Sequence, residues 1–413
     1  MTFHPVSELE VNLSTANRLI RVGRLAAARG RIFFEYDASY IEKGFELSPI
    51  RCPLAPGVKS FDRHLFEGLP GLFYDSLPDG WGRLLLDRKM RKLDVLPQQM
   101  SPLDRLAHVG LDGMGALVYK PCESADGLVG ELNLDTLAER IGYVLEGESG
   151  EVINELLSLN GSSAGARPEA VIGVDPGKRK IVYGKELAYS AGYEPWLVKF
   201  ANSNDGTDAG AIEYVYAAMA IDAGVDMKCV HLFPAQDNPG YFATKRFDRN
   251  QGERIHCHSV CGLLHSNFRT PSLDYQDLIR LTTVLTRDTH QAEKMFRLAV
   301  FNVLSHNRDD HSKNFSFLMD SNGEWRLSPA YDLTFSSGPS GEQSTMVLGK
   351  GKNFEIADLV NLGVEEDFNR SFIDSVIEQT RSSIANWRSL ALNHGVEPDN
   401  IRLIQTRING AAP

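Results

Sequence analysis

One short segment of the chain is rich in side chains that bind metals or move protons. Residues 306–315, HNRDDHSKNF, contain two histidines, two aspartates, two asparagines and a lysine, directly behind the apolar run MFRLAVFNVL. Within this segment, Asp309 stands five positions before Asn314. A carboxylate can accept the proton of an attacking hydroxyl, and carboxylate and amide oxygens are ligands that Mg²⁺ prefers. The segment therefore predicts a proton-transfer loop or a metal site rather than a hydrophilic corner.

Other residues of this kind follow in an order that is typical of phosphoryl transfer. The small-residue loop GSSAGA occupies residues 161–166, Lys199 ends the strand-like PWLVK, and Glu213 lies in the helix-like AIEYVYAAMAIDAGV. After the Asp-x-x-x-x-Asn loop, a hairpin-like stretch leads to Asp332. Protein kinases use the same order: a phosphate-covering loop, a strand lysine paired with a helix glutamate, a catalytic aspartate, and a Mg²⁺-binding asparagine and aspartate. The order predicts a kinase-like site.

This interpretation gives three residues their roles, and the sequence also departs from the kinase pattern. Asp309 becomes the catalytic carboxylate, while Asn314 and Asp332 hold Mg²⁺. However, His311 follows the aspartate, where protein kinases place a histidine before it, and Leu-Thr rather than Phe-Gly follows Asp332. The loop NGSSAGAR also lacks the G-x-G-x-x-G pattern. We therefore expect a distant relative of the kinase fold.

The elements that must position these residues follow from the hydrophobic pattern. The runs RLIRVGRL and GRIFFEYDASYI predict strands near the start, and a helix is expected from near Trp81. The later chain predicts helices interrupted by one hairpin, FSFLM and WRLSPAYDL joined by DSNG. A length of 413 residues favours two or three domains. We predict an α+β, protein-kinase-like two-lobed fold with an additional β-rich N-terminal domain, divided into the β-rich domain (1–123), a connector with the kinase N-lobe (124–260) and a helical C-lobe (261–413).

Composition excludes several classes of protein. A net charge of −11 argues against non-specific nucleic-acid binding, which needs clustered basic residues. No apolar run reaches the roughly 18 residues of a membrane span, and the start shows no basic segment followed by an apolar one. The five cysteines are odd in number and scattered, as is typical of reduced thiols. Together these features predict a cytoplasmic protein with no membrane contact.

Several segments resemble one bacterial family. DDHSKNFSFLMD and WRLSPAYDL look like the D-x-H-x-K-N and P-x-Y-D signatures of HipA-type serine/threonine kinases, the toxins of bacterial toxin–antitoxin modules. VGRLAAARGRIFFEYDASYI and GLPGLFYDSLPDGWGR resemble the N-terminal domain of that family. GSSAGARPEAVI resembles its phosphate-covering loop, and KRFDR resembles a strand end between its lobes. The resemblance extends over nearly the whole chain.

The resemblance implies ATP and Mg²⁺ as cofactors and assigns roles residue by residue. Asp309 is the implied catalytic residue, and the implied metal ligands are Asn314 and Asp332. The serine that the family autophosphorylates matches Ser162, with Ser163 as the second choice. The residues implied to contact ATP are Ala164, Gly165, Ala166, Arg167, Lys199, Val260, His311, Lys313, Asn314, Tyr331 and Asp332, with Val260 near the adenine between the lobes.

The resemblance also implies partners. These are a small helix-turn-helix antitoxin and a protein substrate from translation, such as an aminoacyl-tRNA synthetase. DNA would be contacted only through the antitoxin.

Three alternative interpretations stay open at this point. Histidines and aspartates within residues 306–311 also suit a metal-dependent phosphohydrolase. A catalytically inactive kinase fold could instead serve as the scaffold of a repressor complex. Finally, HCHSVC at residues 256–261 carries zinc-type ligands, but the chain offers no second pair, so a segment that connects the lobes is favoured.

Overall fold

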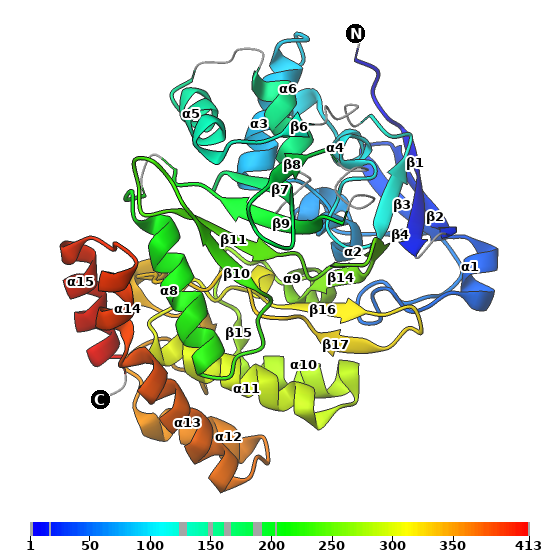
Figure 1. The fold of residues 1–413 in the computed structure, drawn as a ribbon. Helices are drawn as coiled ribbons and strands as arrows, with labels where there is room; N and C mark the ends of the chain where they lie inside the picture. The colour runs from blue at the N-terminus through cyan, green and yellow to red at the C-terminus, as the bar shows by residue number, and fades with distance from the viewer. Residues whose placement is uncertain are drawn as a thin grey trace.

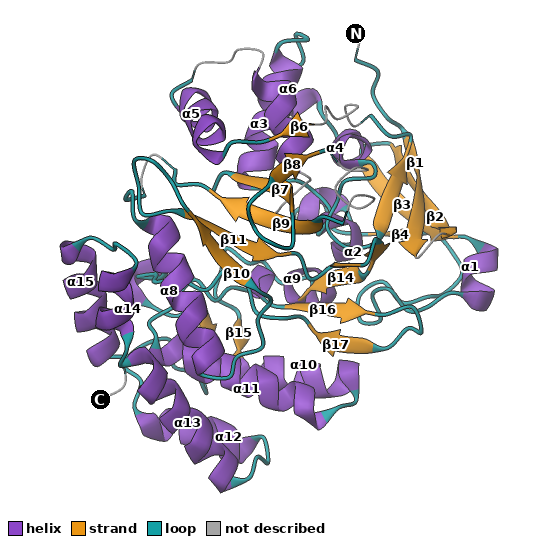
Figure 2. Cartoon of the chain, viewed as in Figure 1, coloured by secondary structure: helices purple, strands orange, loops and turns teal. Residues whose placement is uncertain are grey.

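The computed structural model describes residues 3–15, 18–123, 130–147, 152–160, 167–184, 192–202 and 205–411, and every structural statement below concerns these residues. Figure 1 shows three parts: an N-terminal sheet with short helices, a central sheet, and a C-terminal group of helices. Strands gather in the first two parts and helices in the third (Figure 2). Each helix in the described part of the chain is too short or too polar to span a membrane.

The N-terminal part is built on a five-stranded antiparallel sheet in the order β4-β3-β2-β1-β5. Burial alternates along β3, so that Ile32, Phe34 and Tyr36 face the core, as the two-residue period of a strand requires. The first expected strand is confirmed as β2, and the second is confirmed over β3 only, because the last four residues of GRIFFEYDASYI lie in a short helix. The elements are β1 (Glu8–Thr15), β2 (Arg18–Ala28), β3 (Arg31–Tyr36), α1 (Ala38–Lys43), β4 (Lys59–Ser60), η1 (Phe66–Gly68), α2 (Gly71–Tyr74), α3 (Gly80–Arg91), η2 (Pro97–Gln99), α4 (Pro102–Val109) and β5 (Leu117–Lys120).

Helix α3 links the N-terminal part to the central part. It begins at Gly80, close to the expected start at Trp81, and Asp79 caps it by accepting the Gly80 N–H. Trp81 and Leu85 are buried in the core of the central part rather than under the N-terminal sheet. There α3 lies beside α6 (Val152–Asn160) (Figure 1). A helix from the first 123 residues thus shares a core with the central sheet.

The central part is a six-stranded sheet in the order β10-β11-β9-β7-β8-β6. Its strands are β6 (Gly130–Glu131), β7 (Glu169–Val174), β8 (Ile181–Tyr183), β9 (Glu194–Lys199), β10 (Val230–Phe233) and β11 (Tyr241–Lys245). Helices α5 (Leu134–Leu145) and α6 pack into its core. The expected helix that bears Glu213 is confirmed as α8 (Ala209–Asp222), which lies between this sheet and the C-terminal helices. In the register of β7 and β9, Glu169 lies opposite Lys199.

The C-terminal part is mostly helical, as predicted. Its helices are α9 (Val260–Leu264), α10 (Tyr275–Thr286), α11 (Thr289–Leu304), α12 (Ile356–Glu365), α13 (Arg370–Ile384), α14 (Trp387–Asn393) and α15 (Pro398–Asn409), with η3 (Ser312–Asn314) and η4 (Pro339–Gly341). The expected hairpin is confirmed as β16 (Ser316–Met319) and β17 (Trp325–Leu327), and β14 (His256–Ser259) pairs with β16. Short pairs join β12 (Arg249–Asn250) to β13 (Glu253–Arg254) and β15 (Leu273–Asp274) to β18 (Thr345–Met346).

The N-terminal and C-terminal parts meet closely where α2 contacts α9. A Cβ atom on Gly71 would lie 2.1 Å from the carbonyl oxygen of Gly262, so only glycine allows this approach of the two backbones. The Gly71 N–H also donates to Nε2 of His265 at 2.9 Å. The predicted boundaries near residues 123 and 260 stay predictions, and the hydrophobic cores cross both of them, through α3 and α8 respectively.

Candidate active site

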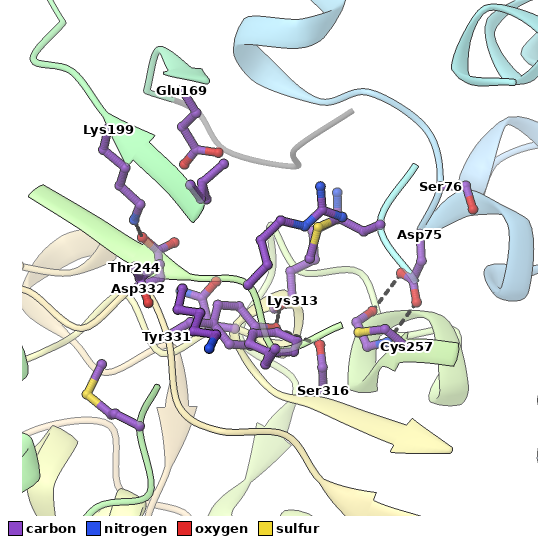
Figure 3. A pocket seen from close by; sticks show the side chains of 18 of the residues that line it. Asp75, Ser76, Glu169, Lys199, Thr244, Cys257, Lys313, Ser316, Tyr331 and Asp332 are labelled. Carbon is purple, nitrogen blue, oxygen red and sulfur yellow. Dashed lines mark hydrogen bonds and ion pairs between the residues drawn. The ribbon is translucent and has the colours of Figure 1, made fainter. Parts of the chain in front are cut away.

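A cavity of about 160 Å³ opens where the three parts meet (Figure 3). The central sheet contributes Lys199 and Thr244 to its wall, and the C-terminal part contributes Asn314 and Asp332. Asp75 of the N-terminal part lines it as well. Ligand sites form preferentially at such junctions between domains. The cavity therefore brings together residues that the sequence places more than two hundred positions apart.

Lys199 is a buried cation of this cavity wall. Its side chain is 9% exposed, its Nζ donates to Oε1 of Glu213 at 2.7 Å, and it also pairs with Asp332. The expected pairing of the strand lysine with the helix glutamate is thereby confirmed. Burial alone would lower the pKa of Lys199, but the carboxylates of Asp332, Glu213 and Glu169 raise it well above its usual range. Lys199 is therefore a permanent positive charge at this end of the cavity.

Asp332 faces Lys199 from a strained backbone. Its φ of 58° lies in the left-handed region, which few residues other than glycine adopt and which is enriched at functional sites. Its side chain keeps 40% of its surface exposed. Burial would raise the pKa of Asp332, but the Lys199 ammonium outweighs this and holds the pKa below its ordinary value. The carboxylate is therefore ionised and still accessible.

Asp309 and Asn314 lie together on the loop that follows α11. Nδ2 of Asn314 donates to the backbone carbonyl of Asp309 at 2.7 Å, which leaves the amide oxygen as the atom that a cation can use. Nε2 of His311 lies 3.8 Å from Oδ1 of Asp309. Burial raises the pKa of Asp309 above its ordinary value; His311 opposes this shift, and the Asp332 carboxylate adds to it. The loop thus offers a carboxylate whose proton affinity is increased and an amide oxygen.

The neighbouring Asp310 points away from the cavity and anchors the loop. Its buried carboxylate accepts the Tyr275 hydroxyl at 2.5 Å, Nε2 of Gln343 at 3.0 Å and the Ser344 N–H at 2.9 Å. His306 is buried too, with Nδ1 3.2 Å from the Ser336 carbonyl. A phosphohydrolase metal cluster would need His306, Asp309, Asp310 and His311 to face one point, and the contacts of Asp310 and His306 point elsewhere.

The zinc-type segment is used for packing between the parts. Nε2 of His256 lies 3.0 Å from the Leu47 carbonyl, and His258 bridges Asp75 (2.6 Å) and Ser48 (3.0 Å). In the described ranges, no group of three or more His, Cys, Asp or Glu side chains is arranged to hold a metal ion. The geometry therefore supports neither a zinc site here nor the phosphohydrolase cluster.

Of three further residues implied to contact a nucleotide, two lie on the C-terminal wall. Lys313 lines the cavity, and its Nζ pairs with Oδ2 of Asp79 at 2.7 Å. Tyr331 also lines it, and its hydroxyl donates to the Lys313 carbonyl at 2.6 Å, which ties the Asp332 loop to the Asn314 loop. His311 lies beside Asp309 rather than among the residues that line the cavity.

The other implied contacts are placed differently. The guanidinium of Arg167 pairs with Asp205 and with Glu213, the carboxylate that Lys199 also contacts. Val260 is completely buried in the C-terminal core and its N–H donates to the Phe315 carbonyl, so nothing in the geometry supports an adenine contact there. Ser162, Ser163, Ala164, Gly165 and Ala166 lie outside the described residues.

Sequence inspection missed three acidic residues of the site. Glu169 faces Lys199 across the β7–β9 ladder, and it could have been found from its place on the strand after the small-residue loop. Asp75 and Asp79 come from the N-terminal part, within the stretch YDSLPDGWG, and their partners lie about two hundred residues away. No local pattern in the sequence signals such contacts.

The chain is similar to proteins of known family. A family model described as the HipA-like C-terminal domain matches residues 161–387, and one described as the HipA N-terminal domain matches residues 14–120. The solved structure of HipA from Shewanella oneidensis MR-1, in complex with HipB and its operator DNA, is 17% identical and aligns over 98% of this chain and 95% of that chain with a TM-score of 0.67. This similarity shows a shared fold. No curated protein matches the sequence.

A second solved structure, the Helicobacter pylori proinflammatory kinase CtkA, is 14% identical over 52% of this chain and 90% of that chain. Its TM-score of 0.32 is too low to carry an argument.

Proposed function

The chain belongs to the HipA family, whose C-terminal domain model covers more than half of it, and on this premise we propose that it is an ATP- and Mg²⁺-dependent serine/threonine protein kinase. One observation carries the proposal. The buried Lys199 joins Glu213 on one side to Asp332 on the other, at the end of a cavity that Asn314 also lines. A permanent cation beside accessible oxygen ligands is the arrangement that binds a nucleotide triphosphate with its metal.

The side chains at this end fit a magnesium ion. Asp332 is ionised because Lys199 lowers its pKa, and the hydrogen bond from Asn314 to the Asp309 carbonyl leaves an amide oxygen for a hard cation. We propose these two residues as the ligands. Mg²⁺ bound there would neutralise charge on the phosphate oxygens during transfer.

The remaining steps belong to the side chains of the protein. Lys199 binds the phosphates, and Asp309 orients the hydroxyl of the substrate and accepts its proton. The Asp309 side chain is 55% exposed, but partial desolvation and the Asp332 carboxylate still raise its pKa, so it is a stronger base than an isolated aspartate. The loop at 161–167 would cover the phosphates, and Ser162 within it, or else Ser163, would be the site of autophosphorylation.

The proposal extends to the setting of the kinase. The solved HipA structure contains HipB and operator DNA, which favours a small DNA-binding antitoxin as the partner of this chain in the cytoplasm. A component of translation, such as an aminoacyl-tRNA synthetase, is the proposed substrate.

Transfer of a labelled γ-phosphate from Mg–ATP to protein tests the proposal. A kinase labels protein, a phosphohydrolase releases phosphate without labelling protein, and an inactive scaffold does neither. Asp309→Asn keeps the size of the side chain but removes the proton acceptor, and we expect the rate to fall by roughly 10²–10⁴-fold. Asp374→Asn, an exposed aspartate on α13, is the matched control. Normal transfer by a folded Asp309→Asn protein would refute the role of Asp309.

Mass spectrometry of the same reaction tests the autophosphorylation site. We expect phosphate on Ser162. Modification confined to residues outside 161–167 would exclude this loop as the target.

A further inference from the structure

The ammonium group of Lys313 is held by two residues of the N-terminal part and by one aromatic ring of the C-terminal part. Nζ lies 2.7 Å from Oδ2 of Asp79, 4.9 Å from the ring centre of Tyr74 and 4.4 Å from the ring centre of Phe268. The lysine is 11% exposed and the aspartate 25%. Two aromatic faces and one carboxylate define a narrow place for the charge, because a cation is attracted to the face of an aromatic ring.

The main chain of Lys313 is fixed independently of this contact. Its carbonyl accepts the Tyr331 hydroxyl, and the next residue, Asn314, is tied to the Asp309 carbonyl. The backbone at Lys313 therefore stays in place whether or not the ammonium has a partner. What Asp79 decides is the direction of a flexible side chain that has four carbons before its charge.

Asp79 itself stands on a rigid support. It caps α3 by accepting the Gly80 N–H at 3.0 Å, and Trp81 and Leu85 anchor that helix in the core of the central sheet. The ion pair thus connects a helix packed on the nucleotide-binding sheet to the loop that carries Asp309 and Asn314. It joins residues 234 positions apart.

We propose that Asp79 is a positioning residue of the kinase site, which holds the Lys313 ammonium at the cavity wall so that it contributes to binding the ATP phosphates. The inference rests on the proposed function, because it assumes a nucleotide in this cavity. It assigns to the N-terminal part a role in nucleotide binding that is exerted through Lys313. The mutual effect of the two groups agrees with it: burial opposes both charges, yet Asp79 raises the pKa of Lys313 and Lys313 lowers the pKa of Asp79, so both stay ionised.

A double-mutant cycle on Mg–ATP affinity tests the proposal. Asp79→Asn is the informative change, because asparagine caps a helix as well as aspartate does but has no negative charge to form an ion pair with the ammonium. We expect it to weaken Mg–ATP binding about tenfold, a loss typical of a hydrogen bond to a charged group. The affinity for adenosine, which has no phosphates, should stay unchanged. In phosphotransfer assays the change should appear in KM and not in kcat, as expected for a contact made equally in the ground and transition states.

The matched variants separate positioning from a structural role. Lys313→Met should weaken Mg–ATP binding at least as much, and adding Asp79→Asn to Lys313→Met should cause no further loss. Asp79→Glu keeps the charge and should recover part of the affinity. Unchanged or tighter Mg–ATP binding by Asp79→Asn, or additive losses in the double variant, would overturn the proposal.

Binding and phosphotransfer are measured separately so that the two proposals can fail separately. If the wild-type protein binds Mg–ATP but transfers no phosphate, the proposed function is wrong, and the affinities of the four variants still decide the role of Asp79. If the wild-type protein binds no Mg–ATP, both proposals are wrong.

Discussion

The cavity has a carboxylate at each end, and the two serve different purposes (Figure 3). Asp332, at the kinase-like end, is 40% exposed and pairs with the Lys199 ammonium. Asp75, at the N-terminal end, is 14% exposed. It accepts hydrogen bonds from Nδ1 of His258 at 2.6 Å, from the Ser259 N–H at 2.7 Å and from the Ser259 hydroxyl at 2.6 Å.

The difference shows how to separate a ligand-binding carboxylate from a structural one. The oxygens of Asp75 are occupied by protein donors, so a cation that came to it would have to displace several hydrogen bonds. Asp332 is instead charge-paired, accessible and held at a φ of 58°, a conformation that costs free energy. Both carboxylates line the same cavity, and Asp332 is the more exposed of the two, which agrees with its proposed role as a metal ligand.

The largest expected effect separates these two carboxylates directly. Asp332→Ala should abolish the rise in melting temperature that Mg–ATP causes, while the stability without ligand stays roughly the same, because Lys199 keeps its bond to Glu213. Asp75→Ala should instead lower the stability without ligand. It leaves the buried donors of His258 and Ser259 without an acceptor, at a cost of about 1–3 kcal/mol each. The rise in melting temperature that Mg–ATP causes should persist. Thermal unfolding with and without Mg–ATP measures both. A normal ligand-induced rise in Asp332→Ala would show that Asp332 binds no metal.

The same contrast explains what the sequence could predict. The Lys199–Glu213 pair could be anticipated from the sequence, because the two residues are 14 positions apart, on a strand and the helix after it. The proximity of Asp309 and Asn314 follows from spacing within one loop. Asp75 and Asp79 contact partners 183 and 234 positions away, so their roles depend on how the parts dock. Val260 was expected near the adenine, but it is buried in the C-terminal core. The place of a residue between the lobes depends on the packing of α9, which the sequence does not show.

Acidification should act on the two ends over different pH ranges. At the N-terminal end, burial lowers the pKa of His256 and of His265 to about 4. Other charged groups near them are His258, Asp75 and Arg51. Between pH 6.5 and 4 the unfolded chain therefore binds protons at these two histidines that the folded chain does not, and their contribution to the free energy of unfolding falls as the pH falls. Burial raises the pKa of Asp310 to about 6, so this carboxyl contributes in the opposite direction. For His256 the loss is on the order of 3 kcal/mol. Asp332 has a lowered pKa, so its stabilising contribution is lost only below its ordinary pKa of 3.8.

Urea unfolding across this pH range tests the prediction. His265 accepts the Gly71 N–H through Nε2, and a glutamine oxygen can accept that bond without titrating. His265→Gln should therefore make the stability less dependent on pH between 6.5 and 4. If the stability of His265→Gln depends on pH as strongly as that of the wild-type protein, the lowered pKa of His265 is contradicted.

The smallest expected effect concerns the glycines at the junction behind the N-terminal end. A Cβ on Gly71 would lie 2.1 Å from the Gly262 carbonyl oxygen, and this backbone contact between α2 and α9 cannot yield by a side-chain movement. Gly71→Ala should therefore destabilise the protein by about 1–3 kcal/mol, the usual cost of overpacking. Gly142, inside α5, is the matched control, because a Cβ there meets nothing within 4 Å. Gly142→Ala should stabilise the protein by up to about 1 kcal/mol through helix propensity alone.

The same substitution at Gly71 should also affect ligand binding. Since α2 carries Tyr74 and leads to Asp75 and Asp79, a shift of this helix moves the carboxylates that hold His258 and Lys313. Gly71→Ala should accordingly weaken Mg–ATP binding as well as stability, whereas Gly142→Ala should leave binding unchanged. If Gly71→Ala lowers stability but binds Mg–ATP normally, the docking of α2 supports the fold and has no part in positioning Lys313.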